Sequence, residues 1–174
     1  HSPDGDQGYP GNADITVSYT LTPDNCLKLD YHMVSDADTI ANFTNHVYFN
    51  LGGYKSGSVL DQKVWMDADY FTATDVNSIP TGELVAVKGT PMDFTEMKPI
   101  GRYIQEDYQA LKYGNGYDHN WALNHPAGEL SLSAKAEDEK TGRTMEVYTD
   151  LPGVQFYTAN FLKSERGKNH AVYT

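Results

Sequence analysis

Alternation of apolar and polar residues is the main pattern along this chain, and its period of two predicts strands. Apolar side chains take every second position from Ile15 to Leu21 and again from Leu27 to Met33, with Thr22-Pro23-Asp24-Asn25 between the two runs. Such alternation is typical of a strand with one buried face, and the residues between the runs favour a turn. We therefore expect the two runs to form an antiparallel hairpin.

The same pattern recurs near the end of the chain. A second pair of strands is predicted from Leu130 to Ala136 and from Met145 to Thr149, with a turn from Asp138 to Gly142. Only the region from Ile100 to Leu111 has apolar spacing that indicates a helical turn or two. The predicted fold class is all-β, and its long connections are where binding groups tend to lie. Those connections are residues 52–57, 75–83 and 112–120.

The stretch from Asn42 to Leu51 combines this alternation with candidate chemistry. If it is a strand, one face is mainly apolar, and the other carries the polar side chains of Asn42, Thr44, His46, Tyr48 and Asn50. Amide, hydroxyl and imidazole groups suit a ligand with many hydroxyls, such as a sugar. His46 is the one side chain here that titrates near neutrality, so it is a candidate proton carrier. An isolated strand histidine is more often half-exposed and without a chemical role.

Charge and composition limit the classes of partner that this chain can bind. The 174 residues contain 13 basic and 24 acidic side chains, a formal net charge of −11, which argues against binding to nucleic acid. No apolar run is long enough for a membrane helix, so we expect a soluble cytoplasmic protein that does not bind membranes. Cys26 is the only cysteine, which excludes an internal disulfide and gives a Cys–His metal site no support.

Asp118 and Gln155 are two further candidates for binding polar ligands. Asp118 follows two glycines, and its carboxylate can accept hydrogen bonds from neighbouring hydroxyls, although glycine and aspartate are also ordinary turn residues. Gln155 and Tyr157 lie two residues apart in an extended run and therefore share a face. The sequence leaves open whether His119 supports Asp118 or is only packed beside it. Asp67 and Asp69 resemble a two-carboxylate hydrolase site, but we interpret them as solvated or turn-forming.

A resemblance to a known family rests on several segments. The run from Phe43 to Leu51 resembles the motif of the aldose 1-epimerases (galactose mutarotases), roughly Leu/Phe-Thr-Asn-His-x-Tyr-Phe-Asn-Leu. Other segments match the family in the same order over essentially the whole chain: Ser2–Gly11, Ile79–Glu83, Gly89–Phe94, Gly116–Asn120 and Pro152–Phe161.

The resemblance implies a fold, an activity and a set of site residues. The fold is the antiparallel β-sandwich, or supersandwich, of the mutarotases, with residues 1–174 a single domain that is incomplete because the N-terminal half is absent. The activity is interconversion of the α and β anomers of a hexose such as galactose or glucose, with no metal and no cofactor. Its general acid maps onto His46, and its substrate-binding aspartate and glutamine map onto Asp118 and Gln155.

The chain also departs from the family pattern. Relatives carry an upstream arginine and histidine, and a catalytic base, a glutamate, in a Leu-Glu-Thr-Gln segment after the region that matches Asn160-Phe161-Leu162. Glu165 lies too early, and in the wrong context, to be that base. We therefore expect the chain alone to be inactive, and to pair with a complementary N-terminal half or with itself.

Other functions remain open from the sequence. A carbohydrate-binding module without turnover is the main alternative, and a purely structural sandwich is a third. An epimerase acting on phosphorylated hexoses would need clustered arginines, whereas Arg102, Arg143 and Arg166 are scattered along the chain.

Overall fold

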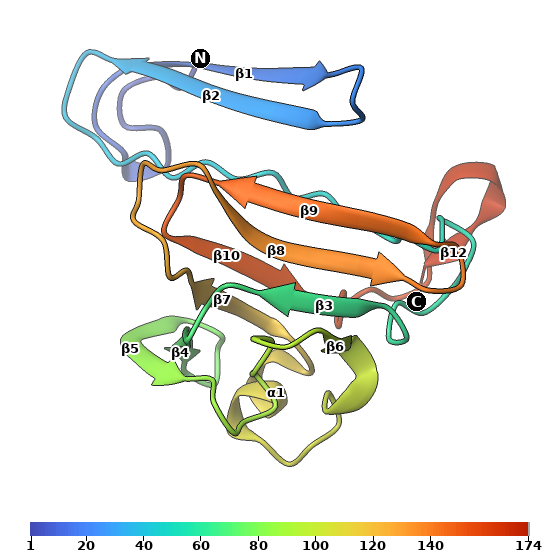
Figure 1. Ribbon diagram of the computed structural model, residues 1–174. Coiled ribbons are helices and arrows are strands. Elements are labelled where there is room, and N and C mark those ends of the chain that lie inside the picture. Colours follow the sequence, from blue (N-terminus) through green and yellow to red (C-terminus); the bar gives the residue numbers. More distant parts are fainter. Residues whose placement is uncertain (174) are drawn as a thin grey trace. The chain divides into compact units, whose positions relative to one another are not determined.

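The computed structural model describes residues 1–173, which divide into two compact units. The first unit, residues 1–47, contains the 3-10 turn η1 (Asp6–Gly8) and the strands β1 (Ala13–Leu21) and β2 (Leu27–Ser35). The strands pair antiparallel, with Val17 opposite Tyr31, so the predicted first hairpin is confirmed (Figure 1).

The apolar side of this hairpin is contacted by a later part of the same unit. The ring of Phe43 stacks on Tyr31 with centroids 6.0 Å apart, and Asn45 Nδ2 donates a hydrogen bond of 2.7 Å to Tyr19 Oη. Phe43 and Asn45 are two residues apart, which agrees with a shared face in extended chain.

The second unit begins at Tyr48 and contains two four-stranded antiparallel sheets. The first has the order β6-β3-β8-β9, and the second has the order β10-β7-β4-β5 (Figure 1). A short β11–β12 pair follows near residue 170. The bounds are β3 Lys63–Met66, β4 Tyr70–Thr74, β5 Pro80–Ala86, β6 Lys98–Pro99, η2 Ile100–Arg102, α1 Gln109–Gly114, β7 Asp118–Ala122, β8 Ser131–Asp138, β9 Arg143–Thr149, β10 Gly153–Tyr157, β11 Glu165–Arg166, η3 Lys168–His170 and β12 Val172–Tyr173.

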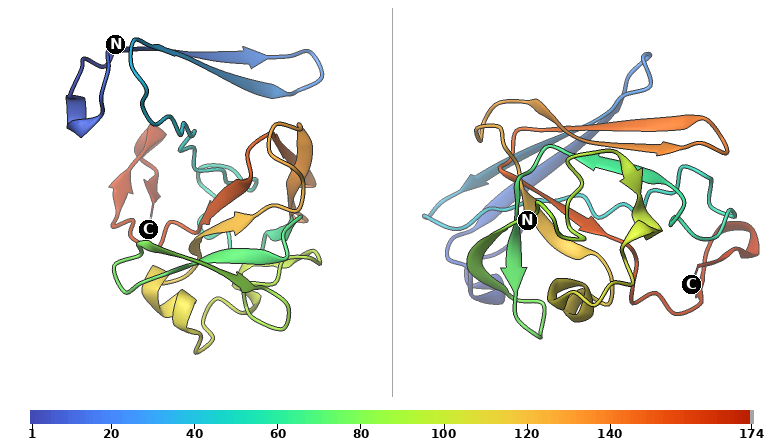
Figure 2. Two further views of the ribbon diagram at one scale, coloured as in Figure 1. Left: turned by 90° about the vertical axis from the view of Figure 1, so that its left-hand side faces the viewer. Right: turned by 60° about the horizontal axis from the view of Figure 1, so that its bottom comes forward.

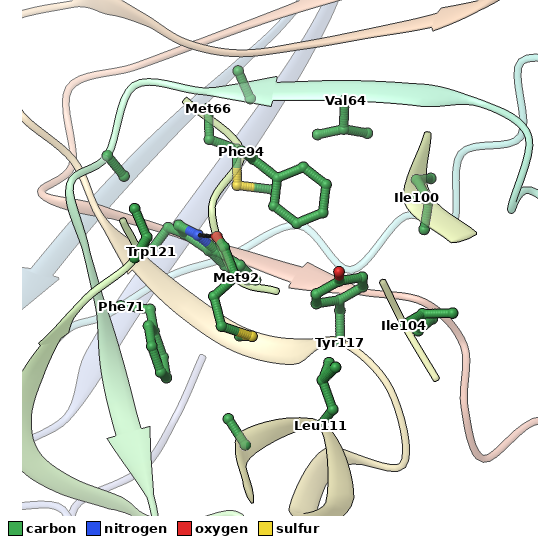
Figure 3. Close-up of a cluster of buried hydrophobic side chains, with 14 residues drawn as sticks. Val64, Met66, Phe71, Met92, Phe94, Ile100, Ile104, Leu111, Tyr117 and Trp121 are labelled. Carbon is green, nitrogen blue, oxygen red and sulfur yellow. Dashed lines mark hydrogen bonds between the residues drawn. The ribbon is translucent and has the colours of Figure 1, made fainter. Parts of the chain in front are cut away.

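Side chains from both sheets meet in one core. Phe94 lies between Val64 and Met66 of β3 on one side and Tyr117 and Trp121 on the other (Figure 3). The rings of Phe94 and Tyr117 pack edge to face with centroids 5.1 Å apart. The six-residue helix α1 contributes Leu111 and contacts β4 and β7 (Figure 2). This aromatic core fixes the positions of β7 and β10, because one face of each strand is buried in it.

The all-β, antiparallel class predicted from the alternation is confirmed, and so is the second strand pair, which is β8 and β9. The turn between them is also as expected: Asp138 Oδ1 accepts hydrogen bonds from the backbone of Lys140 and Thr141. The connection predicted for residues 112–120 is wrong in part, because helix α1 reaches Gly114 and β7 begins at Asp118.

The strand predicted from Asn42 to Leu51 is wrong: residues 36–62 contain no strand. Alternation indicates which side chains share a face, but a strand also needs a neighbouring chain in register, which the pattern does not reveal.

Candidate functional site

The antiparallel pair β7–β10 places the two sequence-predicted binding residues on one face. Asp118 lies opposite Tyr157, and Asn120 lies opposite Gln155. Residues opposite one another in an antiparallel pair point to the same side of the sheet. Gln155 Nε2 donates a hydrogen bond of 2.9 Å to Asp118 Oδ1. The structure thus brings Asp118 and Gln155 together, and Gln155 is exposed while Asp118 is half-buried.

The opposite face of the same strands enters the core. His119 and Trp121 of β7 and Phe156 of β10 alternate with the polar residues, and His119 is only 1% exposed. Its ring packs edge-on against Phe71 and Trp121, and its Nδ1 accepts the backbone N–H of Asp118. Burial lowers the pKa of His119, against the opposing effects of the Asp118 charge and the Ala110 carbonyl. His119 is therefore a neutral core side chain and not a proton carrier on the polar face.

Asn120 extends the polar face toward the neighbouring strand β4. Its Nδ2 donates a hydrogen bond of 2.9 Å to Thr72 Oγ1, and its side chain covers Gly153 of β10 so closely that a Cβ there would overlap Asn120 Oδ1. Neither Asn120 nor Thr72 was expected at this site from the sequence. The signal was present, because Asn120 lies two residues after Asp118 and must share its face in a strand.

Aromatic rings flank the carboxylate–amide pair. Tyr157, directly opposite Asp118, packs edge to face with Tyr48 (centroids 6.0 Å apart) and stacks on Phe161 (6.4 Å). The Phe161 backbone N–H donates to Tyr157 Oη at 3.0 Å. Rings beside hydrogen-bonding groups present both an apolar surface and polar partners, which is what the two kinds of surface on a sugar ring require.

His46 belongs to the first unit, in irregular chain, and its side chain is exposed. Asn50, expected on the same polar face, instead organises the loop that follows it. Asn50 Oδ1 accepts hydrogen bonds from Gly52 N, Ser56 Oγ and Gln62 Nε2, and its Nδ2 donates to the Gly57 carbonyl. The expectation that Asn50 faces a ligand is therefore wrong, because both ends of its amide are used within this loop.

Asp67 and Asp69 lie in the connection between β3 and β4. Asp67 Oδ1 accepts a hydrogen bond from Asn124 Nδ2, and Asn124 Oδ1 accepts the backbone N–H of Asp69. The Asp67 carboxylate is thus part of a turn, whereas Asp69 is exposed and contributes its backbone N–H. Within residues 1–173 there is no group of three or more His, Cys, Asp or Glu side chains arranged to hold a metal ion. No helix in the same range is both long and apolar enough to cross a bilayer.

Together, the fold and these residues define an antiparallel β-sheet protein whose exposed sheet face carries a carboxylate, amides and aromatic rings. Comparison with known proteins gives the family. The chain belongs to the aldose 1-epimerase family, whose model matches residues 1–174. The resemblance found in the sequence is confirmed.

Individual relatives agree with this assignment. The chain is 41% identical to galactose mutarotase of Sus scrofa over 173 residues, which cover 99% of this chain and 48% of the relative. It is 39% identical to aldose 1-epimerase of Haemophilus influenzae, over 99% of this chain and 50% of the relative. A crystal structure of an aldose epimerase homologue from C. elegans superposes with a TM-score of 0.85 at 28% identity, over 98% of this chain and 50% of that one. The chain spans about half the length of the curated relatives it matches.

Proposed function

We propose that these residues carry the general acid and part of the sugar-binding surface of an aldose 1-epimerase acting on hexoses such as galactose or glucose. The observation that carries the proposal is the Gln155–Asp118 hydrogen bond on an exposed sheet face of a family member. The pair offers a carboxylate acceptor and an amide, which together can bind adjacent sugar hydroxyls.

The reaction needs two proton transfers. A base removes the proton from the C1 hydroxyl while an acid delivers a proton to the ring oxygen, so the C1–O5 bond breaks and an open-chain aldehyde forms. Rotation about C1–C2 presents the other face of the aldehyde, and closure reverses both transfers. In our proposal His46 protonates the ring oxygen, and Asp118 and Gln155 hold the hydroxyls. The base is a glutamate supplied from outside these residues.

Substitution separates the two roles. His46→Gln keeps hydrogen-bonding capacity but cannot relay a proton, so we expect sugar affinity to persist while kcat falls by about 10²–10⁴-fold. Asp118→Asn replaces a charge-assisted acceptor with a neutral one, so we expect both affinity and rate to fall. The assay is polarimetry on a chimera that extends this chain to family length with segments of the Sus scrofa relative. Near-normal kcat in His46→Gln removes it from the acid role, and unchanged KM and kcat in Asp118→Asn make that residue structural.

A non-catalytic carbohydrate-binding role is the second candidate. Asp118, Gln155 and Tyr157 all lie on two adjacent strands of the second unit, and this favours the binding role. These three side chains can form a sugar-binding surface without a general acid or base. Such a protein binds sugar without accelerating mutarotation. Sugar binding by the chimera with no rate above a buffer control therefore selects this candidate.

A further inference from the structure

Asn160 lies just beyond β10, and its side chain bonds to the backbone on both sides of the turn that precedes Asp118. Asn160 Nδ2 donates to the carbonyl of Gly114 at 2.8 Å and to the carbonyl of Tyr117 at 2.9 Å. Gly114 ends helix α1, and Tyr117 immediately precedes Asp118. One primary amide thus joins the end of the helix to the start of the strand.

The orientation of this amide is fixed by a third contact. Thr158 Oγ donates to Asn160 Oδ1 at 2.6 Å, and the same hydroxyl accepts the backbone N–H of Tyr117 at 3.2 Å. A flipped amide would set its oxygen against the two carbonyl oxygens of Gly114 and Tyr117. Both protons of the Asn160 amide and its oxygen are therefore used, in one arrangement only.

The backbone on both sides is shaped to allow this contact. Gly116 has a φ of +131°, and a Cβ at that position would overlap Asn160 Oδ1. Ala159 is a non-glycine residue with a φ of +60°, a left-handed conformation that costs free energy in the absence of compensating bonds. The left-handed backbone at Ala159 orients the next side chain, Asn160, toward the turn.

The backbone that leads into Asp118 is held by Thr158 as well as by Asn160. The Tyr117 carbonyl also accepts the backbone N–H of Thr158 at 3.1 Å, and the Tyr117 N–H donates to Thr158 Oγ1. The Tyr117 ring is anchored in the core, where its hydroxyl donates to the Pro91 carbonyl at 3.0 Å, but residues 115–116 lie in a turn between helix and strand. The Asn160 amide restrains the carbonyl of Tyr117, and therefore the peptide unit that leads into Asp118. Movement there would displace the Asp118 carboxylate from Gln155.

We propose that Asn160 is a positioning residue for Asp118: its amide holds the Gly114–Tyr117 turn so that the Asp118 carboxylate meets Gln155 and, resting on the proposed function, the sugar hydroxyls. The mechanism proposed above gives Asn160 no contact with substrate.

The test uses Asn160→Ala, with Asn124→Ala as the matched control. Asn124 is also an asparagine whose amide bonds at both ends, to the Asp67 carboxylate and to the backbone N–H of Asp69, beyond the other end of β7. The side-chain amide resonance of Gln155 in a ¹⁵N-labelled protein reports its hydrogen bond to Asp118 without any sugar. We expect this resonance to move in Asn160→Ala toward its position in Asp118→Ala, and to stay in place in Asn124→Ala.

Galactose affinity provides the second readout. We expect Asn160→Ala to raise the Kd for galactose about tenfold. In the Asp118→Asn background the same substitution should change the Kd less than about twofold, because the two residues act through one contact. Thr158→Val, which removes the hydroxyl that orients Asn160, should show the same pattern more weakly and replaces Asn160→Ala if that variant does not fold.

The outcomes separate the two proposals. An unmoved Gln155 resonance in a folded Asn160→Ala or Thr158→Val protein overturns the positioning role, and so does an unchanged Kd where the wild type binds galactose. If the wild type binds neither galactose nor glucose, the proposed function fails, and the sugar-free Gln155 resonance still decides the role of Asn160.

Discussion

At the scale of single residues, strand alternation places the polar and the buried side chains of β7 on opposite faces. Asp118 and Asn120 face outward, while His119 and Trp121 between and beyond them are buried. The sequence identified Asp118 and Gln155 because a family motif surrounds each of them. It left His119 undecided, because two adjacent titratable residues look alike until the face of each is known.

A second residue with an unusual environment is Lys98. It is 6% exposed, its Nζ donates to the Pro91 carbonyl at 2.9 Å, and Nζ lies 4.3 Å from the centroid of the Phe94 ring and 4.9 Å from that of Tyr103. Burial lowers the pKa of Lys98 from 10.5 to about 8, although the charge of Asp93 acts in the opposite direction. The ammonium group is therefore costly to keep in the folded protein at neutral pH.

This pKa predicts how stability depends on pH. Below about pH 8 the lysine is charged in both the folded and the unfolded protein, and the cost of burying the charge is fully present. Between about pH 8 and 10.5 the unfolded chain binds more protons than the folded one, so this lysine makes the free energy of unfolding rise with pH, by up to about 3 kcal/mol.

The measurement is urea unfolding of the wild type and Lys98→Met at several pH values. As pH rises from about 8 to 10.5, the free energy of unfolding of the wild type should increase relative to that of Lys98→Met. Lys88→Met, at an exposed lysine, is the control and should show no such trend. A pH-independent difference for Lys98→Met would contradict the buried-charge interpretation.

At the scale of elements, the sequence predicts the hairpins well and the segment around His46 poorly. β1–β2 and β8–β9 each contain both partners of a ladder within one short stretch of sequence, so local alternation and turn residues suffice to find them. Residues 42–51 contain equally clear alternation but no strand, because pairing depends on a distant part of a chain. The β7–β10 pair joins residues more than thirty positions apart, and so only the family motifs indicated that Asp118 and Gln155 belong together.

The close contact between Gly153 of β10 and the Asn120 side chain of β7 predicts that a larger residue at position 153 is destabilising. Its Cβ, if present, would overlap Asn120 Oδ1, and its φ is in the range open to other residues. We expect Gly153→Ala to lower the free energy of unfolding by about 1–3 kcal/mol, because the Asn120 side chain must leave its position and its bond to Thr72.

A double-mutant cycle checks this cause. In the Asn120→Ala background the added methyl group has space, so Gly153→Ala should cost less than about 0.5 kcal/mol by urea unfolding. Equal costs in both backgrounds would show that something other than Asn120 makes glycine necessary there.

At the scale of the whole molecule, we propose that residues 1–174 belong to a single mutarotase-like sandwich domain. The support is that the chain matches relatives over about half of their length, and that a two-stranded hairpin such as β1–β2, with one apolar face, is marginally stable without further packing.

The chimera with the Sus scrofa segments tests this idea against the chain alone. We expect the chimera to gain both melting temperature and mutarotase rate, whereas the 174-residue chain binds sugar but shows little or no mutarotase activity. Polarimetry with a buffer control and differential scanning calorimetry measure the two quantities. Full catalytic rate from the chain alone would show that a residue within it, such as Glu83, serves as the base.

Binding of a hexose to the exposed face of β7 and β10 can be mapped residue by residue on the backbone amides. In ¹⁵N–¹H spectra of the 174-residue chain, added galactose should shift the amides of Asp118–Asn120 and Gln155–Tyr157 in a saturable way. The same shifts should need a higher galactose concentration in Asp118→Asn and the unchanged concentration in Asp69→Asn, a substitution in the β3–β4 connection. No saturable shift, or shifts that leave β7 and β10 unchanged, would show that this face does not bind galactose.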